Sequence, residues 1–117
     1  MTVEEYFKKN NLNQEDFNAE QMQQIRQGLK EGLDISKYTN PKFNYSQMRE
    51  IRWGLKQGLD VSKYAKSKFN WQQMSEIRWG LEAGLDVSWY AKSKFNWLIM
   101  FLIRAGLKSI NKEKKWE

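Results

Sequence analysis

The chain repeats one sequence pattern every 26 residues. Phe17, Phe43, Phe69 and Phe95 each begin a copy, which reads Phe-Asn-x-x-Gln-Met-x-x-Ile-Arg-x-Gly-Leu-x-x-Gly-Leu-Asp-Val-Ser-x-Tyr in the two central copies. Those two copies are identical at 20 of their 26 positions. A fixed period of this length is typical of stacked helical arrays, in which each unit buries its apolar face against its neighbours. We therefore expect an all-α, solenoid-like array of four repeats that acts by binding rather than by covalent chemistry.

Each repeat is expected to form a short helix followed by a long one. Asn44 is a good N-cap, and Gln47 three residues later completes a capping-box pair. Gly58 is a natural C-terminal stop, so the pattern predicts a long helix over about 45–57. Asp60 is placed to cap the next short helix. We expect four such units, at about 2–31, 34–57, 60–83 and 86–110, followed by a frayed charged tail at 112–117.

The first repeat departs from this pattern. Thr2, Val3 and Tyr6 have the same spacing as the cap, valine and tyrosine of a later short helix, with Glu5 as the expected capping partner of Thr2. The segment from Phe7 to Asp16 is then an insertion that lengthens the first short helix or its loop.

Composition excludes several classes of function. A chain of 117 residues forms one domain at most, and it has neither cysteine nor histidine. Disulfides, zinc sites built on thiolate or imidazole, and catalytic groups that need either residue are therefore excluded. Because no nucleophile has a base partner and no glycine-rich phosphate loop is present, we expect no enzyme, no cofactor and no metal.

Neither targeting nor membrane insertion is indicated. The first residues after Met1 are acidic and not apolar, which argues against a secretory signal peptide. The longest apolar run, from Trp97 to Ile103, has seven residues, far fewer than the ~20 needed to cross a bilayer. The sequence predicts a soluble protein.

Glycine and arginine recur inside the expected long helices. Glycine costs a helix interior ~1 kcal/mol relative to alanine, so we expect close backbone approach where helices cross. The arginines either form a row that binds the phosphates of a nucleic acid or make ion pairs with a recurring aspartate, and we favour the ion pairs. The glycines are Gly28, Gly54, Gly80 and Gly106; the arginines are Arg26, Arg52, Arg78 and Arg104; the aspartates are Asp34, Asp60 and Asp86.

Basic and aromatic side chains are the candidates for partner binding. The net charge is +6 and 15% of residues are aromatic, a balance that suits either nucleic acid or an acidic protein surface. On a helical wheel, two tryptophans lie about 140° from the apolar stripe, where they either form an interface hot spot or are buried by a neighbouring unit. Lysines crowd the short-helix segments as a basic ridge, which is either a solvated face or a contact surface. The candidate partner-binding residues are Trp53, Trp79, Arg49, Trp89, Lys63, Lys66, Lys92 and Lys94.

The last expected helix is apolar where the earlier copies are polar. Terminal units of helical arrays normally turn a polar face to water, so this helix needs a cover. The cover is the N-terminal segment, a second copy of the chain or the target, and the N-terminal segment lies at the other end of a linear stack. We therefore favour self-association as a homodimer. The candidate self-association residues are Trp97, Leu98, Phe101 and Leu102.

Two phrases of the repeat, Phe-Asn-x-x-Gln-Met-x-Glu-Ile-Arg-x-Gly-Leu and Gly-Leu-Asp-Val-Ser-x-Tyr-Ala-Lys, resemble a known repeat. It occurs in proteins of phages, plasmids and integrative elements of Gram-positive bacteria, and the resemblance covers Phe17 to about Leu107. The resemblance implies a non-enzymatic counter-defence factor, such as an anti-CRISPR protein, that acts in the cytoplasm of the bacterial host cell. Its partner would be a bacterial defence effector protein or ribonucleoprotein, with direct DNA or RNA binding and structural homo-oligomerisation as the alternatives.

Overall fold

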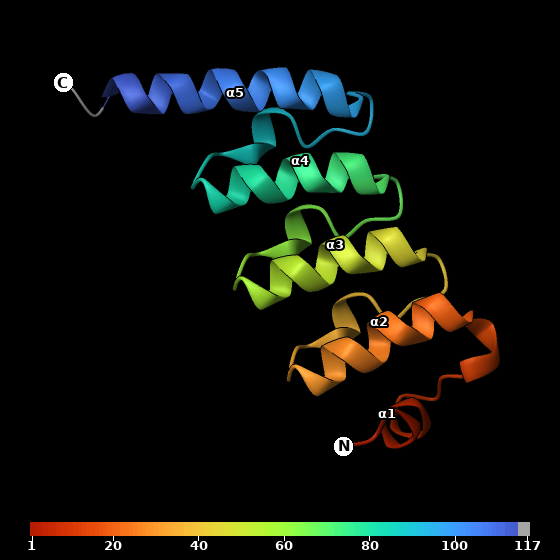
Figure 1. Ribbon diagram of the computed structural model, residues 1–117. Helices are drawn as coiled ribbons and strands as arrows, with labels where there is room; N and C mark the ends of the chain where they lie inside the picture. The colour runs from red at the N-terminus through yellow and green to blue at the C-terminus, as the bar shows by residue number, and fades with distance from the viewer. Residues whose placement is uncertain (115–117) are drawn as a thin grey trace.

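The computed structural model describes residues 1–114 and is all-α over that range (Figure 1). Five α-helices alternate with four short 3-10 helices, and no strand occurs within the described residues. The expected all-α class is therefore confirmed. The α-helices are α1 (Val3–Lys9), α2 (Ala19–Lys30), α3 (Tyr45–Lys56), α4 (Trp71–Glu82) and α5 (Trp97–Lys114), and the 3-10 helices are η1 (Gln14–Asp16), η2 (Ile35–Lys37), η3 (Val61–Lys63) and η4 (Val87–Trp89).

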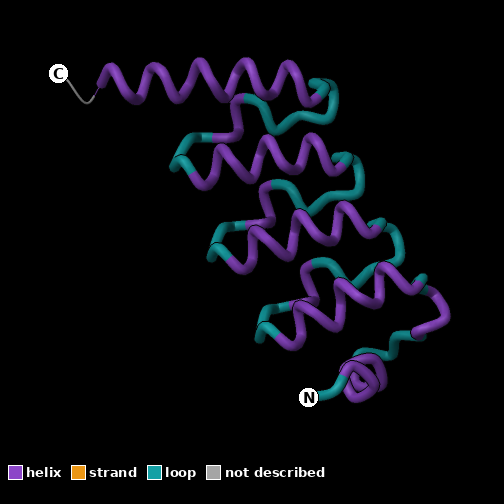
Figure 2. Tube along the Cα trace, viewed as in Figure 1, coloured by secondary structure: helices purple, strands orange, loops and turns teal. Residues whose placement is uncertain are grey.

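The long helices α2, α3, α4 and α5 lie side by side in chain order, and η2, η3 and η4 each lie between two successive ones (Figures 1 and 2). The molecule is elongated, with extents of 54 × 26 × 18 Å. Helix α1 packs beside α2, at the opposite end of the molecule from α5. The N-terminal segment therefore does not cover the apolar last helix.

The local signals for helix α3 are confirmed. Asn44 is its N-cap, and Asn44 and Gln47 form a reciprocal capping box. The α-helix ends at Lys56, one residue before the predicted end, and Gly58 follows with a φ of 73°. Only glycine adopts that left-handed conformation without steric cost, which explains its place as the stop.

The capping glutamine also joins one repeat to the next. Gln47 Nε2 donates a hydrogen bond of 2.7 Å to the backbone oxygen of Phe69, 22 residues later. Gln21 and Gln73 make the same bond to the oxygens of Phe43 and Phe95. One side chain thus caps its own helix and holds the loop that precedes the following long helix.

The helix glycines make room for a tyrosine. Tyr64 is fully buried, and its hydroxyl donates a hydrogen bond of 2.6 Å to the backbone oxygen of Glu50. A Cβ atom on Gly54 would lie 2.0 Å from that hydroxyl oxygen. The expected close approach at the glycine is thus present, but the approaching group is the Tyr64 side chain of the same repeat and not another helix backbone. The same pairing recurs for Gly28 with Tyr38 and for Gly80 with Tyr90. At Gly106 the expectation is wrong, because a Cβ there would meet nothing within 4 Å.

The N-terminal segment follows the predicted outline. The Thr2 hydroxyl accepts a hydrogen bond from the Glu5 backbone N–H, so Thr2 is the cap of α1. The insertion lengthens the first short helix to the two turns of α1 and adds η1. The rings of Phe7 and Phe17 pack edge to face with their centres 5.5 Å apart, and this contact anchors the inserted segment to the first 26-residue repeat.

The C-terminal boundary differs from the prediction. Helix α5 continues to Lys114, so the residues from 112 to 114, expected in a frayed tail, extend the helix. The rest of the expected tail, 115–117, lies outside the described residues.

Candidate protein-binding surface

Each repeat arginine pairs with a glutamate earlier in the chain and not with the recurring aspartates, and Arg78 also pairs with Glu82 of its own helix. Arg78 Nε lies 2.9 Å from Glu50, and Arg104 Nε lies 2.8 Å from Glu76, in each case 28 residues earlier. Arg52 lies 2.7 Å from Glu31. The predicted pairs with Asp34, Asp60 and Asp86 are wrong, because those aspartates cap the short helices and accept hydrogen bonds from Ser36, Ser62 and Ser88.

This pairing decides what the arginines can do. The side chains of Arg52, Arg78 and Arg104 are largely buried, and each has a carboxylate within ion-pair distance. Their charge is compensated inside the protein, so they do not form an exposed row that binds phosphates. They join consecutive long helices instead. Arg26 alone of the series is exposed, 3.8 Å from an exposed Glu4.

Aromatic rings and guanidinium groups alternate along one side of α3, α4 and α5. The Arg78 guanidinium carbon lies 5.4 Å from the centre of the Trp53 ring and 5.6 Å from that of Trp79. Arg104 lies 5.5 Å from both Trp79 and Phe101. Contacts at this distance between a guanidinium and an aromatic face are attractive. We call this surface the aromatic–arginine face; it comprises Tyr45, Arg49, Trp53, Trp71, Arg78, Trp79, Trp97, Phe101 and Arg104.

The face is directed away from the short helices. Gly54 faces η3, since its missing Cβ would meet Val61 and Tyr64. Successive helix residues are about 100° apart, so Arg49 lies about 140° around α3 from Gly54. The long helices thus bury one side under the short helices and present another to solvent.

The exposure of the tryptophans follows from this placement. Trp79 is 43% exposed, whereas Trp53 is half-buried beneath Arg49 and Arg78. Trp71, which the sequence analysis did not select, is 41% exposed on the same side. It lies eight residues before Trp79, about 80° around the helix, so the same wheel could have identified it.

The predicted partner-binding residues fall into two groups. Trp53, Trp79 and Arg49 belong to the aromatic–arginine face. The second group lies on or just after the short helices η3 and η4, where every member is exposed and Trp89 reaches 64%. That group is Lys63, Lys66, Trp89, Lys92 and Lys94.

Helix α5 presents apolar side chains where α4 uses polar ones. In α4, Gln73 and Glu76 are buried and hold the following repeat through hydrogen bonds to Phe95 and Arg104. The equivalent residues of α5 are Ile99 and Leu102, and both are exposed. The predicted self-association residues Trp97, Leu98, Phe101 and Leu102 are likewise exposed. The uncovered side of α5 is thus unlike the sides that join the repeats.

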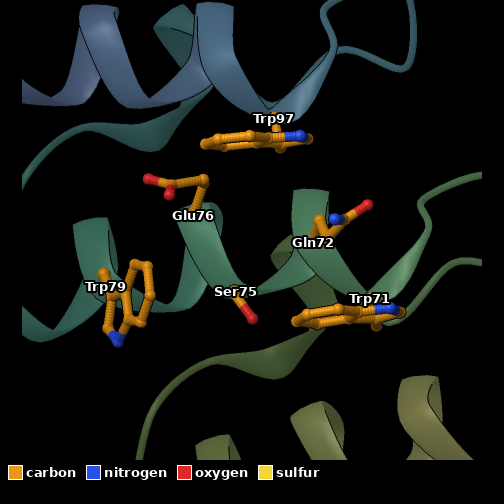
Figure 3. Close-up of a pocket in the computed structure, with 6 residues that line it drawn as sticks. All are labelled: Trp71, Gln72, Ser75, Glu76, Trp79 and Trp97. Atoms are coloured by element: carbon orange, nitrogen blue, oxygen red, sulfur yellow. The ribbon is translucent and has the colours of Figure 1, made fainter.

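A pocket of ≈ 250 Å³ opens on the aromatic–arginine face between α4 and α5. Figure 3 shows the rings of Trp97 and Trp71 facing each other across it, with Ser75 between Trp71 and Trp79. Gln72 and Glu76 complete the lining. The walls are mainly indole rings, and the nearest carboxylate, that of Glu76, is paired with Arg104.

Titratable groups are perturbed for structural reasons. Burial raises the pKa of the Tyr38, Tyr64 and Tyr90 hydroxyls. The hydrogen bond from Lys56 lowers the pKa of Glu31, and the Ser62 hydroxyl lowers that of Asp60. Within residues 1–114, no group of three acidic, histidine or cysteine side chains is placed to hold a metal ion. No helix in the same range combines the length and the hydropathy that a bilayer span needs.

Comparison with protein families, with characterised proteins and with solved structures finds no significant match.

Proposed function

We propose that this chain is a non-enzymatic protein-binding module, built as a solenoid-like array, that binds its target through the aromatic–arginine face. The observation that carries the proposal is the row of solvent-facing tryptophans beside Arg78 and Arg104, whose charges are already balanced internally. Tryptophan and arginine are enriched in interface hot spots, and a clustered exposed aromatic patch is costly to leave in water. A surface of this kind favours a protein partner over a phosphate backbone.

The target that we propose is a bacterial nucleic-acid-handling defence complex, which the chain inhibits stoichiometrically. This step rests on the resemblance of the repeat to those of Gram-positive mobile elements. The physical contribution of the fold is an elongated, pre-organised surface, which loses little conformational entropy on binding. Such a surface inhibits by occupying a site or by holding a mobile lobe in place.

The test is an inhibition titration against purified RNA-guided nucleases from Gram-positive bacteria. The proposal predicts that DNA cleavage by at least one nuclease ends at about one chain per complex. Trp71→Ala combined with Trp79→Ala should weaken inhibition by at least about 100-fold, since hot-spot residues each contribute 2 kcal/mol or more. Trp89→Ala is the matched control, because Trp89 is more exposed but lies outside the face. Equal loss for both variants, with folding intact, would refute the assigned surface.

Direct nucleic-acid binding is the second candidate, favoured by the exposed lysines of η3 and of the loops that follow η3 and η4. It predicts an affinity that falls steeply with salt, by about one power of concentration per phosphate contact. Lys63→Ala with Lys66→Ala would then reduce that slope, whereas the tryptophan variant would leave it unchanged.

Homo-oligomerisation is the third candidate, favoured by the uncovered apolar side of α5. It predicts a dimer in sedimentation analysis and a monomer for Phe101→Glu with Leu102→Glu. A monomeric wild-type chain at high concentration would exclude it.

A further inference from the structure

Because the sequence repeats every 26 residues, the pocket between α4 and α5 can be compared with the equivalent place between α3 and α4. Each lining residue has an equivalent one repeat earlier, and the aromatic and acidic walls are retained: Tyr45 for Trp71, Trp53 for Trp79, Trp71 for Trp97 and Glu50 for Glu76. The decisive difference is one residue. Ser75 stands where the earlier repeat has Arg49.

In the earlier repeat, the arginine itself occupies the space between the rings. The Arg49 guanidinium carbon lies 4.9 Å from the centre of the Trp53 ring, 5.5 Å from that of Tyr45 and 6.0 Å from that of Trp71. Its Nε is buried and has no hydrogen-bond partner among the described residues. The aromatic walls are therefore what hold this guanidinium.

The later repeat keeps the walls without the cation. Ser75 is buried and short, and the pocket above it is several times the ~30 Å³ that one water molecule occupies in the liquid. The surrounding charges also match, because Arg104 lies over Trp79 as Arg78 lies over Trp53, at 5.5 and 5.4 Å. An environment that accepts the Arg49 guanidinium is thus repeated with that group absent.

We propose that the pocket lined by Trp71, Trp79 and Trp97 binds an arginine side chain presented by the protein partner. The planar guanidinium stacks on indole rings, which suits this pocket better than the compact ammonium of lysine. The three indoles supply the attraction, and Ser75 supplies the space. This inference deepens the proposed function, on which it rests for the identity of the partner as a protein.

The test uses blocked pentapeptides, Gly-Gly-Arg-Gly-Gly with the lysine and leucine versions, titrated into the full chain. The readout is the indole N–H resonances in a nitrogen-15 NMR spectrum. We expect the arginine peptide to shift the signals of Trp71, Trp79 and Trp97 with a Kd of about 1–10 mM, the affinity expected when cation–π contacts with all three indoles add together. The Trp89 signal should stay in place, and the leucine peptide should bind at least about 5-fold more weakly.

Two variants make the test specific. Ser75→Arg places in the pocket the residue that fills it one repeat earlier, and it should abolish the shifts without unfolding the chain. Arg49→Ser should open an equivalent pocket and add a shift at Trp53. If Ser75→Arg keeps the shifts, or if Arg49→Ser adds none at Trp53, while the variant remains folded, the pocket is not an arginine-binding site.

The remaining outcomes are also decisive. Equal binding of the arginine and leucine peptides would make the pocket an apolar site, and no binding at all would remove it as a site. A Trp97 shift that appears on concentrating the chain alone would assign the pocket to a second copy instead of a partner. Failure of the peptide titration leaves the proposed function standing, because the face has other contact residues. Failure of the inhibition assay would leave the titration unaffected.

Discussion

The pair Gly54 and Gly106 tests the packing logic of the repeat with one substitution at equivalent positions. Both lie inside long helices, but their surroundings differ. A Cβ on Gly54 would lie 2.0 Å from the Tyr64 hydroxyl oxygen and 2.8 Å from Val61 Cγ1, whereas a Cβ on Gly106 would meet nothing within 4 Å. Alanine should therefore have opposite effects at the two sites.

The magnitudes follow from the contacts. Gly106→Ala gains the helix propensity of alanine and should stabilise the fold by about 1 kcal/mol. Gly54→Ala has the same gain but displaces the Tyr64 ring, and it thereby breaks the buried bond to the Glu50 oxygen. A buried hydroxyl without a partner costs about 1–3 kcal/mol, and overpacking costs about 1–3 kcal/mol more. The net loss should be about 1–5 kcal/mol.

Urea unfolding of both variants measures the two values under identical conditions. The expected result is a higher midpoint for Gly106→Ala and a lower one for Gly54→Ala. Equal shifts of the urea midpoint, or a stabilising effect of Gly54→Ala, would refute the view that the tyrosine hydroxyl leaves room only for glycine at this position. Either result would also leave the recurrence of glycine at this position of the long helices without a structural explanation.

Two further predictions concern buried polar groups, namely the tyrosine hydroxyls within the repeats and the arginine–glutamate pairs between them. Because burial raises the pKa of the three repeat tyrosines above the unfolded value of about 10, their contribution to stability is complete below pH 10 and is lost as the pH rises further. Tyr64→Phe should make the alkaline loss of unfolding free energy shallower by about 1.4 kcal/mol per pH unit, and an unchanged slope in urea unfolding above pH 10 would contradict this. Arg78→Met should cost about 3–5 kcal/mol, because the Glu50 side chain is only 2% exposed and would be left as an unpaired charge. The exposed Arg26 is the control: Arg26→Met should cost less than about 1 kcal/mol, and similar losses in thermal unfolding would disprove the distinction.

The features that sequence predicted well depend on neighbouring residues. Asn44, Gln47 and Gly58 specify the ends of α3 through bonds within a few residues, so the pattern was sufficient. The alternation of short and long helices follows from the repetition of those signals. The apolar character of α5 was also evident, because a departure from a repeat is visible against the other copies.

The features that sequence did not predict depend on which side chains meet across repeats. Asp60 and Arg78 recur with the same period, but the period does not reveal that Asp60 is engaged by Ser62 and that Arg78 reaches Glu50 in the preceding helix. The change from Arg49 to Ser75 reads as ordinary surface variation in sequence. Only the structure shows that aromatic rings surround both positions, so that the change from arginine to serine leaves a pocket.

The most direct test of the central claim is a pull-down from lysate of Gram-positive bacteria, with and without nuclease, using three baits. The baits are the wild-type chain, the Trp71→Ala and Trp79→Ala double variant, and the Lys63→Ala and Lys66→Ala double variant. The account predicts one discrete protein that survives nuclease treatment, is retained by the lysine variant and is lost from the tryptophan variant. Recovery of nucleic acid alone, lost on digestion and dependent on the lysines, would contradict it.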